Sequence, residues 1–146
     1  MKKKKQRQDK PAQEITWHPL SSLPLIARLI DDGVRDAESQ EKLLLEGKDK
    51  PYVFDDDMVR RIKRVHSEKL DFINIYLEQI ERWKKETLTM DQNFELMRLI
   101  KQCERLKVLT TSILDLAEEI GKATIDKIMD MDDAEVGLRF LLGELS

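Results

Sequence analysis

The fold is decided by the stretch LMRLIKQCERLKVLTTSILDLAEEIGKAT, residues 96–124. Apolar or small side chains recur in it at alternating steps of three and four residues, the heptad spacing that gathers side chains on one face of an α-helix. This face consists of Leu96, Leu99, Cys103, Leu106, Thr110, Ile113, Ala117, Ile120 and Thr124. Ile128 and Met131 continue the spacing. We therefore expect one helix that passes through Gly121 and extends for about 60 Å, at 1.5 Å per residue.

A first helix is expected well before this stretch. It begins at Ser21, whose hydroxyl can cap the free backbone N–H groups of the first turn, and Leu20 and Leu25 are spaced as a hydrophobic staple. It ends near Gly47, where a glycine, lysines and a proline follow one another. Its buried stripe is predicted to be Leu23, Ile26, Ile30, Val34 and Ala37.

A second helix is expected between the other two. Asp55 or Asp56 caps its start, where a carboxylate also favours the positive end of the helix dipole, and it runs to about Lys85. Its buried side is predicted to be Ile62, Leu70, Ile73, Leu77, Ile80 and Trp83. A short apolar helix is also expected near the C-terminus, capped by Asp132.

These patterns predict an all-α fold: an up-down bundle of three long helices plus a short C-terminal helix. The composition agrees, because 38% charged residues with 5 glycines and 4 prolines favour long exposed helices over strands and turns. Residues 1–14 are expected to form a flexible basic arm, and residues 15–146 the helical bundle domain. Within the arm, MKKKKQRQDK carries six basic residues and one acidic residue.

The leading functional prediction is a non-enzymatic module for protein-protein interaction or scaffolding. Three helices of unequal length would leave part of the longest one's heptad face uncovered, so we expect a homodimer or a helical protein partner to cover it. The candidate interface residues are Leu99, Leu106, Ile113 and Ile120, with Trp17 as a further core or interface residue.

An alternative prediction is a regulatory protein associated with nucleic acid. Its candidate polyanion contacts are the cations of the arm and of the second helix, namely Lys2, Lys3, Lys4, Lys5, Arg60, Arg61, Lys63 and Arg64. Against it, Asp56 and Asp57 stand four residues before Arg60 and Arg61, which is the favourable order for ion pairs along a helix. We therefore expect this cluster to form a solvated, paired surface.

The stretch WHPLSSLPLI, residues 17–26, has two interpretations. It could line a pocket with His18 as a base, or it could anchor an extended segment to the bundle through Trp17 and Leu20. We favour the anchor, because the sequence identifies no carboxylate partner for His18. The other histidine, His66, is expected to be a boundary residue that makes a hydrogen bond or a packing contact.

The sequence shows no recognisable catalytic or cofactor-binding pattern. The histidines lack the Glu-x-x-His spacing of di-iron bundles, and Gly121-Lys122 lacks the earlier glycine of a phosphate loop. The single cysteine, Cys103, cannot form an internal disulfide and is expected in the core. No apolar run is long enough to span a membrane. We expect a cytoplasmic protein without enzymatic activity, metal, cofactor or small-molecule ligand.

Overall fold

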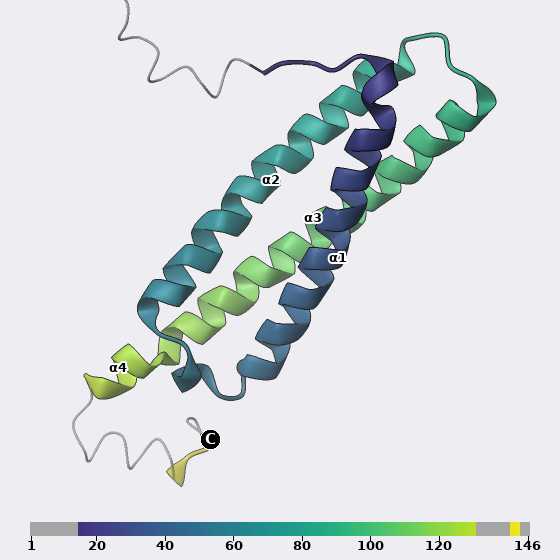
Figure 1. The fold of residues 1–146 in the computed structure, drawn as a ribbon. Helices are drawn as coiled ribbons and strands as arrows, with labels where there is room; N and C mark the ends of the chain where they lie inside the picture. Colours follow the sequence, from purple (N-terminus) through teal and green to yellow (C-terminus); the bar gives the residue numbers. More distant parts are fainter. Residues whose placement is uncertain (1–14, 131–140, 144–146) are drawn as a thin grey trace, which may run out of the picture.

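The computed structural model describes residues 15–130 and 141–143, and it is a bundle of three long α-helices (Figure 1). Helix α1 spans Leu23–Gly47, α2 spans Asp56–Lys84 and α3 spans Met90–Ile120. They are antiparallel in turn, running down, up and down in the view of Figure 1, and both α1 and α2 pack along α3. A short helix, α4, follows at Ile125–Met129, and the described ranges contain no strand. The predicted all-α fold of three long helices and a short C-terminal helix is confirmed.

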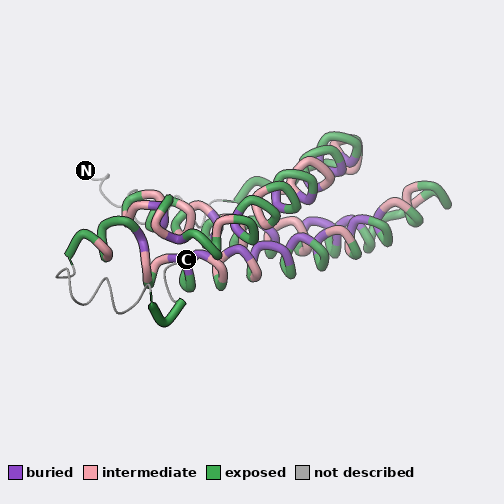
Figure 2. The backbone as a smooth tube through the Cα atoms, turned by 90° about the horizontal axis from the view of Figure 1, so that it is seen from below, coloured by how far each residue is buried: buried purple, intermediate pink, exposed green. Residues whose placement is uncertain are grey.

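The heptad face of α3 is the centre of the core. Every position predicted for it is buried, from Leu96 to Thr124. The predicted stripe of α1 is buried as well, and in α2 the side chains of Ile73, Ile80 and Trp83 are excluded from solvent. Figure 2 shows the buried residues along the sides of the helices that face one another. The spacing of apolar side chains therefore predicts the buried rows of α1 and α3, whereas in α2 the predicted residues Ile62, Leu70 and Leu77 are only partly buried against the core.

Helix α1 begins differently from the prediction. A single 3₁₀ turn, Leu20–Ser22, precedes it, and Ser22 occupies the cap position without a side-chain hydrogen bond. The predicted cap at Ser21 is therefore wrong, and so is the staple, because Leu25 is 55% exposed. The 3₁₀ turn rotates the chain before α1 starts, and the entry is held instead by contacts of residues 17–20, described below.

The starts of α2 and α3 have side-chain caps. Asp55 accepts a hydrogen bond of 2.7 Å from the Met58 N–H, which confirms one of the two caps predicted for α2. Thr89 accepts a hydrogen bond from the Gln92 N–H, and the Gln92 side chain accepts one from the Thr89 N–H. This capping box stabilises the first turn of α3 and fixes where the α2–α3 connection ends.

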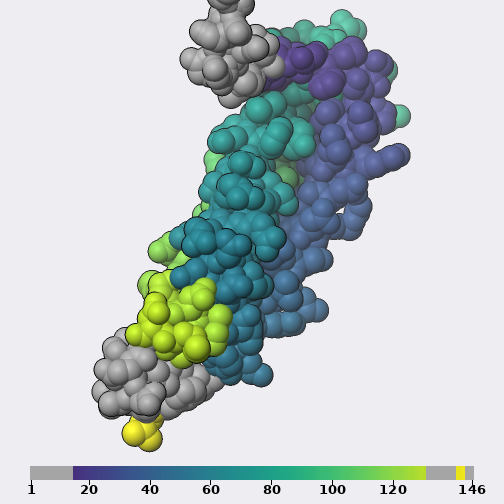
Figure 3. Space-filling model, turned by 60° about the vertical axis from the view of Figure 1, so that its left-hand side comes forward, coloured from purple at the N-terminus to yellow at the C-terminus, as the bar shows by residue number. Residues whose placement is uncertain are grey.

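Helix α3 does not pass through Gly121, so the prediction of one 60 Å helix is wrong. Gly121 starts a 3₁₀ turn, and Thr124 is extended and caps α4 by accepting from the Lys127 N–H. The next residue, Ile125, donates its N–H to the Phe54 carbonyl oxygen at 2.8 Å, which ties the turn to the α1–α2 connection. Thr124 also donates a hydrogen bond of 2.6 Å to the carboxylate of Asp56, the first residue of α2. Figure 3 shows α4 against this N-terminal end of α2.

The corrected lengths remove the argument for an uncovered heptad face. The long helices contain 25, 29 and 31 residues, or about 38, 44 and 47 Å, so α1 and α2 can cover the heptad face of α3 along nearly its whole length. The helix predicted from Asp132 lies outside the described residues except for positions 141–143, and the basic arm, with Lys2 to Lys5, lies outside them entirely. Among the described helices, none has the length and apolarity needed to cross a membrane.

Candidate interaction surface

The four predicted interface residues lie inside the chain. Leu99 and Ile113 are 0% exposed, Ile120 is 1% exposed and Leu106 is 5% exposed, all of them between α3 and the other two helices. Of the two roles considered for this face, core and interface, the structure places them in the core. A surface that binds another protein must therefore consist of other residues.

The segment before α1 is an anchor. The Trp83 indole N–H donates to the His18 carbonyl oxygen at 3.0 Å, and the His18 N–H donates to the Gln79 side-chain oxygen at 2.7 Å. The Trp17 ring lies 4.1 Å from the Arg82 guanidinium carbon, a cation–π contact. The two hydrogen bonds use the backbone of His18, whose side chain is exposed. The anchoring interpretation is confirmed.

His66 is a core residue, which corrects the expected boundary position. It is 4% exposed, and its Nδ1 atom has no hydrogen-bond partner among the described residues. Burial, with a smaller contribution from the positive charge of Lys69, lowers the pKa of His66 below its usual value. The folded chain therefore favours the neutral imidazole, and the side chain contributes packing.

The four cations of the basic cluster on α2 differ in whether they form ion pairs. Arg60 pairs with Asp57 at 2.8 Å, and Lys63 pairs with Glu118 of α3 at 2.6 Å. Asp56, predicted to pair with Arg60, binds Lys127 instead, at 2.8 Å. Arg61 and Arg64 are exposed and border a hollow of about 320 Å³. Arg60 is thus paired within α2 and only Lys63 links α2 to α3, so the paired surface that was expected is present only in part.

Cys103 is a core residue, as predicted. Its side chain is 0% exposed, and burial, with a smaller effect of the Glu104 charge, raises the pKa of the thiol to about 11. A thiol in this state is a poor nucleophile at neutral pH.

In residues 15–130 and 141–143, no three histidine, cysteine or acidic side chains converge in the way a metal ion requires.

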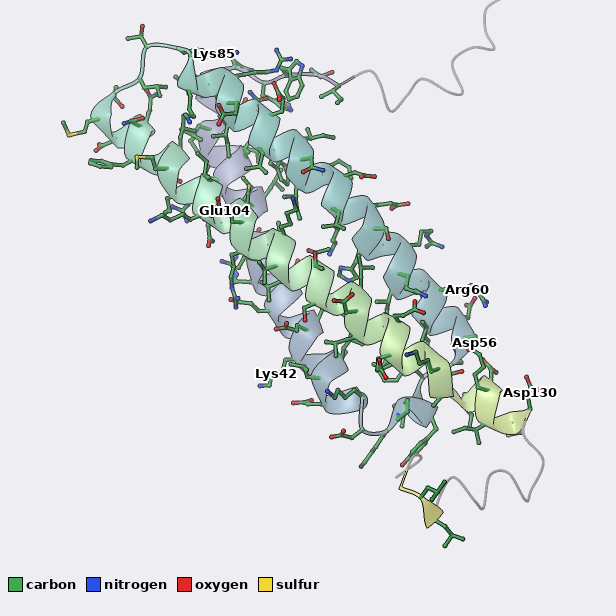
Figure 4. The ribbon with its side chains drawn as sticks, turned by 180° about the vertical axis from the view of Figure 1, so that it is seen from behind. Lys42, Asp56, Arg60, Lys85, Glu104 and Asp130 are labelled. Carbon is green, nitrogen blue, oxygen red and sulfur yellow. The ribbon has the colours of Figure 1, made fainter. Side chains whose placement is uncertain are left out.

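A second row of side chains runs along α3 on the side opposite its heptad face, and we call it the outer face. It consists of Met90, Phe94, Met97, Lys101, Glu104, Val108, Thr111 and Asp115, again at alternating steps of four and three. All eight residues are exposed. Neither α1 nor α2 covers this side, and Figure 4 views the molecule with α3 in front and Glu104 on it.

The two halves of the outer face differ in shape and chemistry. The first half is apolar and protrudes: Met90 is 75% exposed, Phe94 61% and Met97 54%. The second half borders a hollow of about 1020 Å³, whose lining combines Val108, Thr111, Ser112 and Leu116 with the charged residues Lys48, Glu104, Lys107, Asp115 and Glu119. Val108 is 63% exposed. A protruding apolar half and a hollowed half therefore lie end to end on one helix.

The charged side chains on the flanks of α3 are used within the chain, whereas those in the middle of the outer face are not. Arg98 forms a two-pronged pair with Asp31 of α1, with both distances 2.9 Å, and Arg105 pairs with Glu38 of α1 at 3.3 Å. Lys101 and Glu104 form no ion pair with any residue that the structure describes.

The outer face was missed at the level of sequence, although its signal is present there. Its members follow the same spacing as the heptad face and differ only in offset, but lysine, glutamate and threonine interrupt its apolar residues. The spacing alone gives two candidate rows, and the row that is almost entirely apolar forms the core.

A scan against protein-family models found no match to this chain, and searches of curated proteins and of solved structures returned none either. The described residues define a three-helix bundle whose central helix carries a partly apolar face that neither α1 nor α2 covers.

Proposed function

We propose that this chain is a non-enzymatic module for protein-protein interaction or scaffolding, and that the outer face of α3 is its docking surface. The observation that carries the proposal is the row of Met90, Phe94, Met97 and Val108, each more than half exposed, on a helix whose opposite face already forms the core. Scattered exposed apolar side chains are ordinary, but a row on one helical face is typical of an interaction surface.

The composition of this row supports docking to another helix. Methionine and aromatic side chains are enriched at protein interfaces, where they bury much apolar area, and methionine adapts to the shape of its partner. A helix commonly engages a partner through side chains at i, i+3, i+4 and i+7, which is the spacing of the outer face. The same residues in a chain that acted alone would add apolar surface in contact with water without adding to the core.

Oxidation of methionines tests this function. Met90 and Met129 are each 75% exposed, but Met90 lies on the outer face and Met129 on α4, so they form a matched pair. Peroxide treatment of the full chain is followed by mass spectrometry, first with dilute purified protein and then in a concentrated extract of the cells that make it. We expect oxidation of Met90 and Met97 to slow several-fold in the extract relative to Met129. Equal slowing of Met90 and Met129 would contradict the proposal.

A further inference from the structure

We infer that the outer face of α3 binds the outer face of a second copy of this chain. The two helices run antiparallel, and the numbers of any two residues that face each other add up to 205. This inference rests on the proposed function and adds the identity, direction and register of the partner. It follows from the spacing, the shape and the charges of the outer face.

The spacing is that of a two-helix seam. Steps of four and three along the outer face place its eight members in layers, as the heptad positions of a coiled coil do. In a two-fold interface, if one residue contacts a second across the axis, the second contacts the first in the same way. With the axis between residues 102 and 103, Met97 faces the partner's Val108 and Phe94 faces the partner's Thr111. The seam from Met90 to Asp115 is about 38 Å long.

The shapes of the two halves agree with this register. The protruding half, Met90 to Met97, and the hollowed half, Val108 to Asp115, lie at equal distances from the axis. Reversal therefore lays each protruding half over the partner's hollow. The Phe94 ring, 61% exposed in the single chain, would lie over Thr111 and Ser112, two of the residues that line the hollow. Each pairing occurs twice in the dimer, so each favourable contact contributes twice to the stability of the dimer.

The charges decide between directions. At a sum of 205, Lys101 faces the partner's Glu104, and Glu104 faces the partner's Lys101. A parallel pair in register would instead place Lys101 against the partner's Lys101 and Glu104 against the partner's Glu104, which is repulsive in both layers. Lysine before glutamate is also the less favourable order for pairing along a helix, which leaves both charges available to a partner.

The rest of the bundle leaves room for the second copy. Both α1 and α2 are bound to the other side of α3, and their ion pairs with Arg98, Arg105 and Glu118 fasten its flanks. A second α3 would thus add a layer on the open side, in the view of Figure 4, without displacing either helix.

Charge reversal tests the arrangement. We measure the solution mass of full-length chains by light scattering over a range of concentrations. Wild type is expected to approach about 34 kDa, twice the 17.2 kDa chain. Lys101→Glu and Glu104→Lys each create two like-charge contacts and should raise the dissociation constant about tenfold or more. The double variant restores both contacts and should return near the wild-type value, and the two single variants mixed together should form mixed dimers.

A matched control is available on α2. Lys84 and Glu81 are also an exposed Lys/Glu pair three residues apart, so Lys84→Glu should leave the mass curve unchanged. All variants change exposed residues, and circular dichroism verifies that they fold. A wild-type mass of 17.2 kDa at every concentration would overturn the second copy as partner, while protection of Met90 in the cell extract would still support the interaction function. If Lys101→Glu leaves the dissociation constant unchanged, or if the double variant stays dissociated, the proposed register is wrong.

Discussion

Ile113→Asp is expected to leave the chain unfolded at room temperature. Ile113 is 0% exposed, in the middle of the heptad face of α3. Removing a buried isoleucine side chain costs about 2–5 kcal/mol. A carboxylate at that place adds the cost of leaving water, whether it remains charged or takes up a proton. Domains are commonly stable by about 5–15 kcal/mol, so the sum is of the same order as the whole stability.

Circular dichroism and a urea titration measure this effect. Leu29→Asp is the control, because Leu29 is an apolar residue inside the long helix α1 but is 46% exposed and lies off the outer face. We expect Leu29→Asp to remain helical with nearly the wild-type urea midpoint, and Ile113→Asp to lose its helical signal. A helical Ile113→Asp variant with a wild-type midpoint would show that the heptad face is not the core.

Trp83→Ala is expected to destabilise the bundle by about 3–5 kcal/mol, the range for removal of a large buried aromatic side chain. Trp83 is 0% exposed, and its indole N–H donates to the His18 carbonyl oxygen. The substitution therefore opens a cavity at the end of α2 and also releases the segment before α1. We expect Trp83→Phe, which keeps much of the packing and loses the hydrogen bond, to cost less.

The comparison for this prediction is Trp17→Ala. Trp17 is half-buried and stacks on Arg82 at the surface, an arrangement worth about 0.5–1 kcal/mol when exposed. Urea unfolding followed by circular dichroism gives both values. If the two substitutions cost the same, the anchor would depend on the Trp17 stack as strongly as on the buried Trp83, which would contradict this prediction.

Sequence spacing was sufficient for the core of the bundle and insufficient for its ends. The row from Leu96 to Ile120 was predicted residue by residue, because a helix that buries one face must repeat apolar residues at three and four. The same rule extended α3 wrongly through Gly121. After Gly121 the direction of the chain is set by hydrogen bonds to Phe54 and Asp56, which are about 70 residues away in sequence. The spacing of neighbouring residues cannot predict contacts of this kind.

The proposed interaction surface shows the same limit. Leu106 and Val108 are both apolar and both lie in a regular row, yet one is 5% exposed and the other 63%. The heptad face forms the core because its side chains are almost all apolar, whereas polar and charged residues interrupt the outer face. The ion pairs of Arg98 and Arg105 with α1, which fasten the flanks of α3, involve residues 67 positions apart. The four residues predicted as an interface therefore lie in the core, and the docking surface that we propose is the opposite face of the same helix.

Disulfide formation between Met97→Cys and Val108→Cys, placed together in one chain, tests the central claim most directly. In an antiparallel dimer with facing residues that sum to 205, each new cysteine lies opposite the other kind in the partner. The native Cys103 is buried and its thiol pKa is raised to about 11, so it should not compete. We expect mild oxidation to convert the double variant to covalent dimers on a non-reducing gel, whereas each single variant, whose cysteines would lie about 16 Å apart along the helices, stays monomeric. Covalent dimers from the single variants, or none from the double variant, would contradict the account.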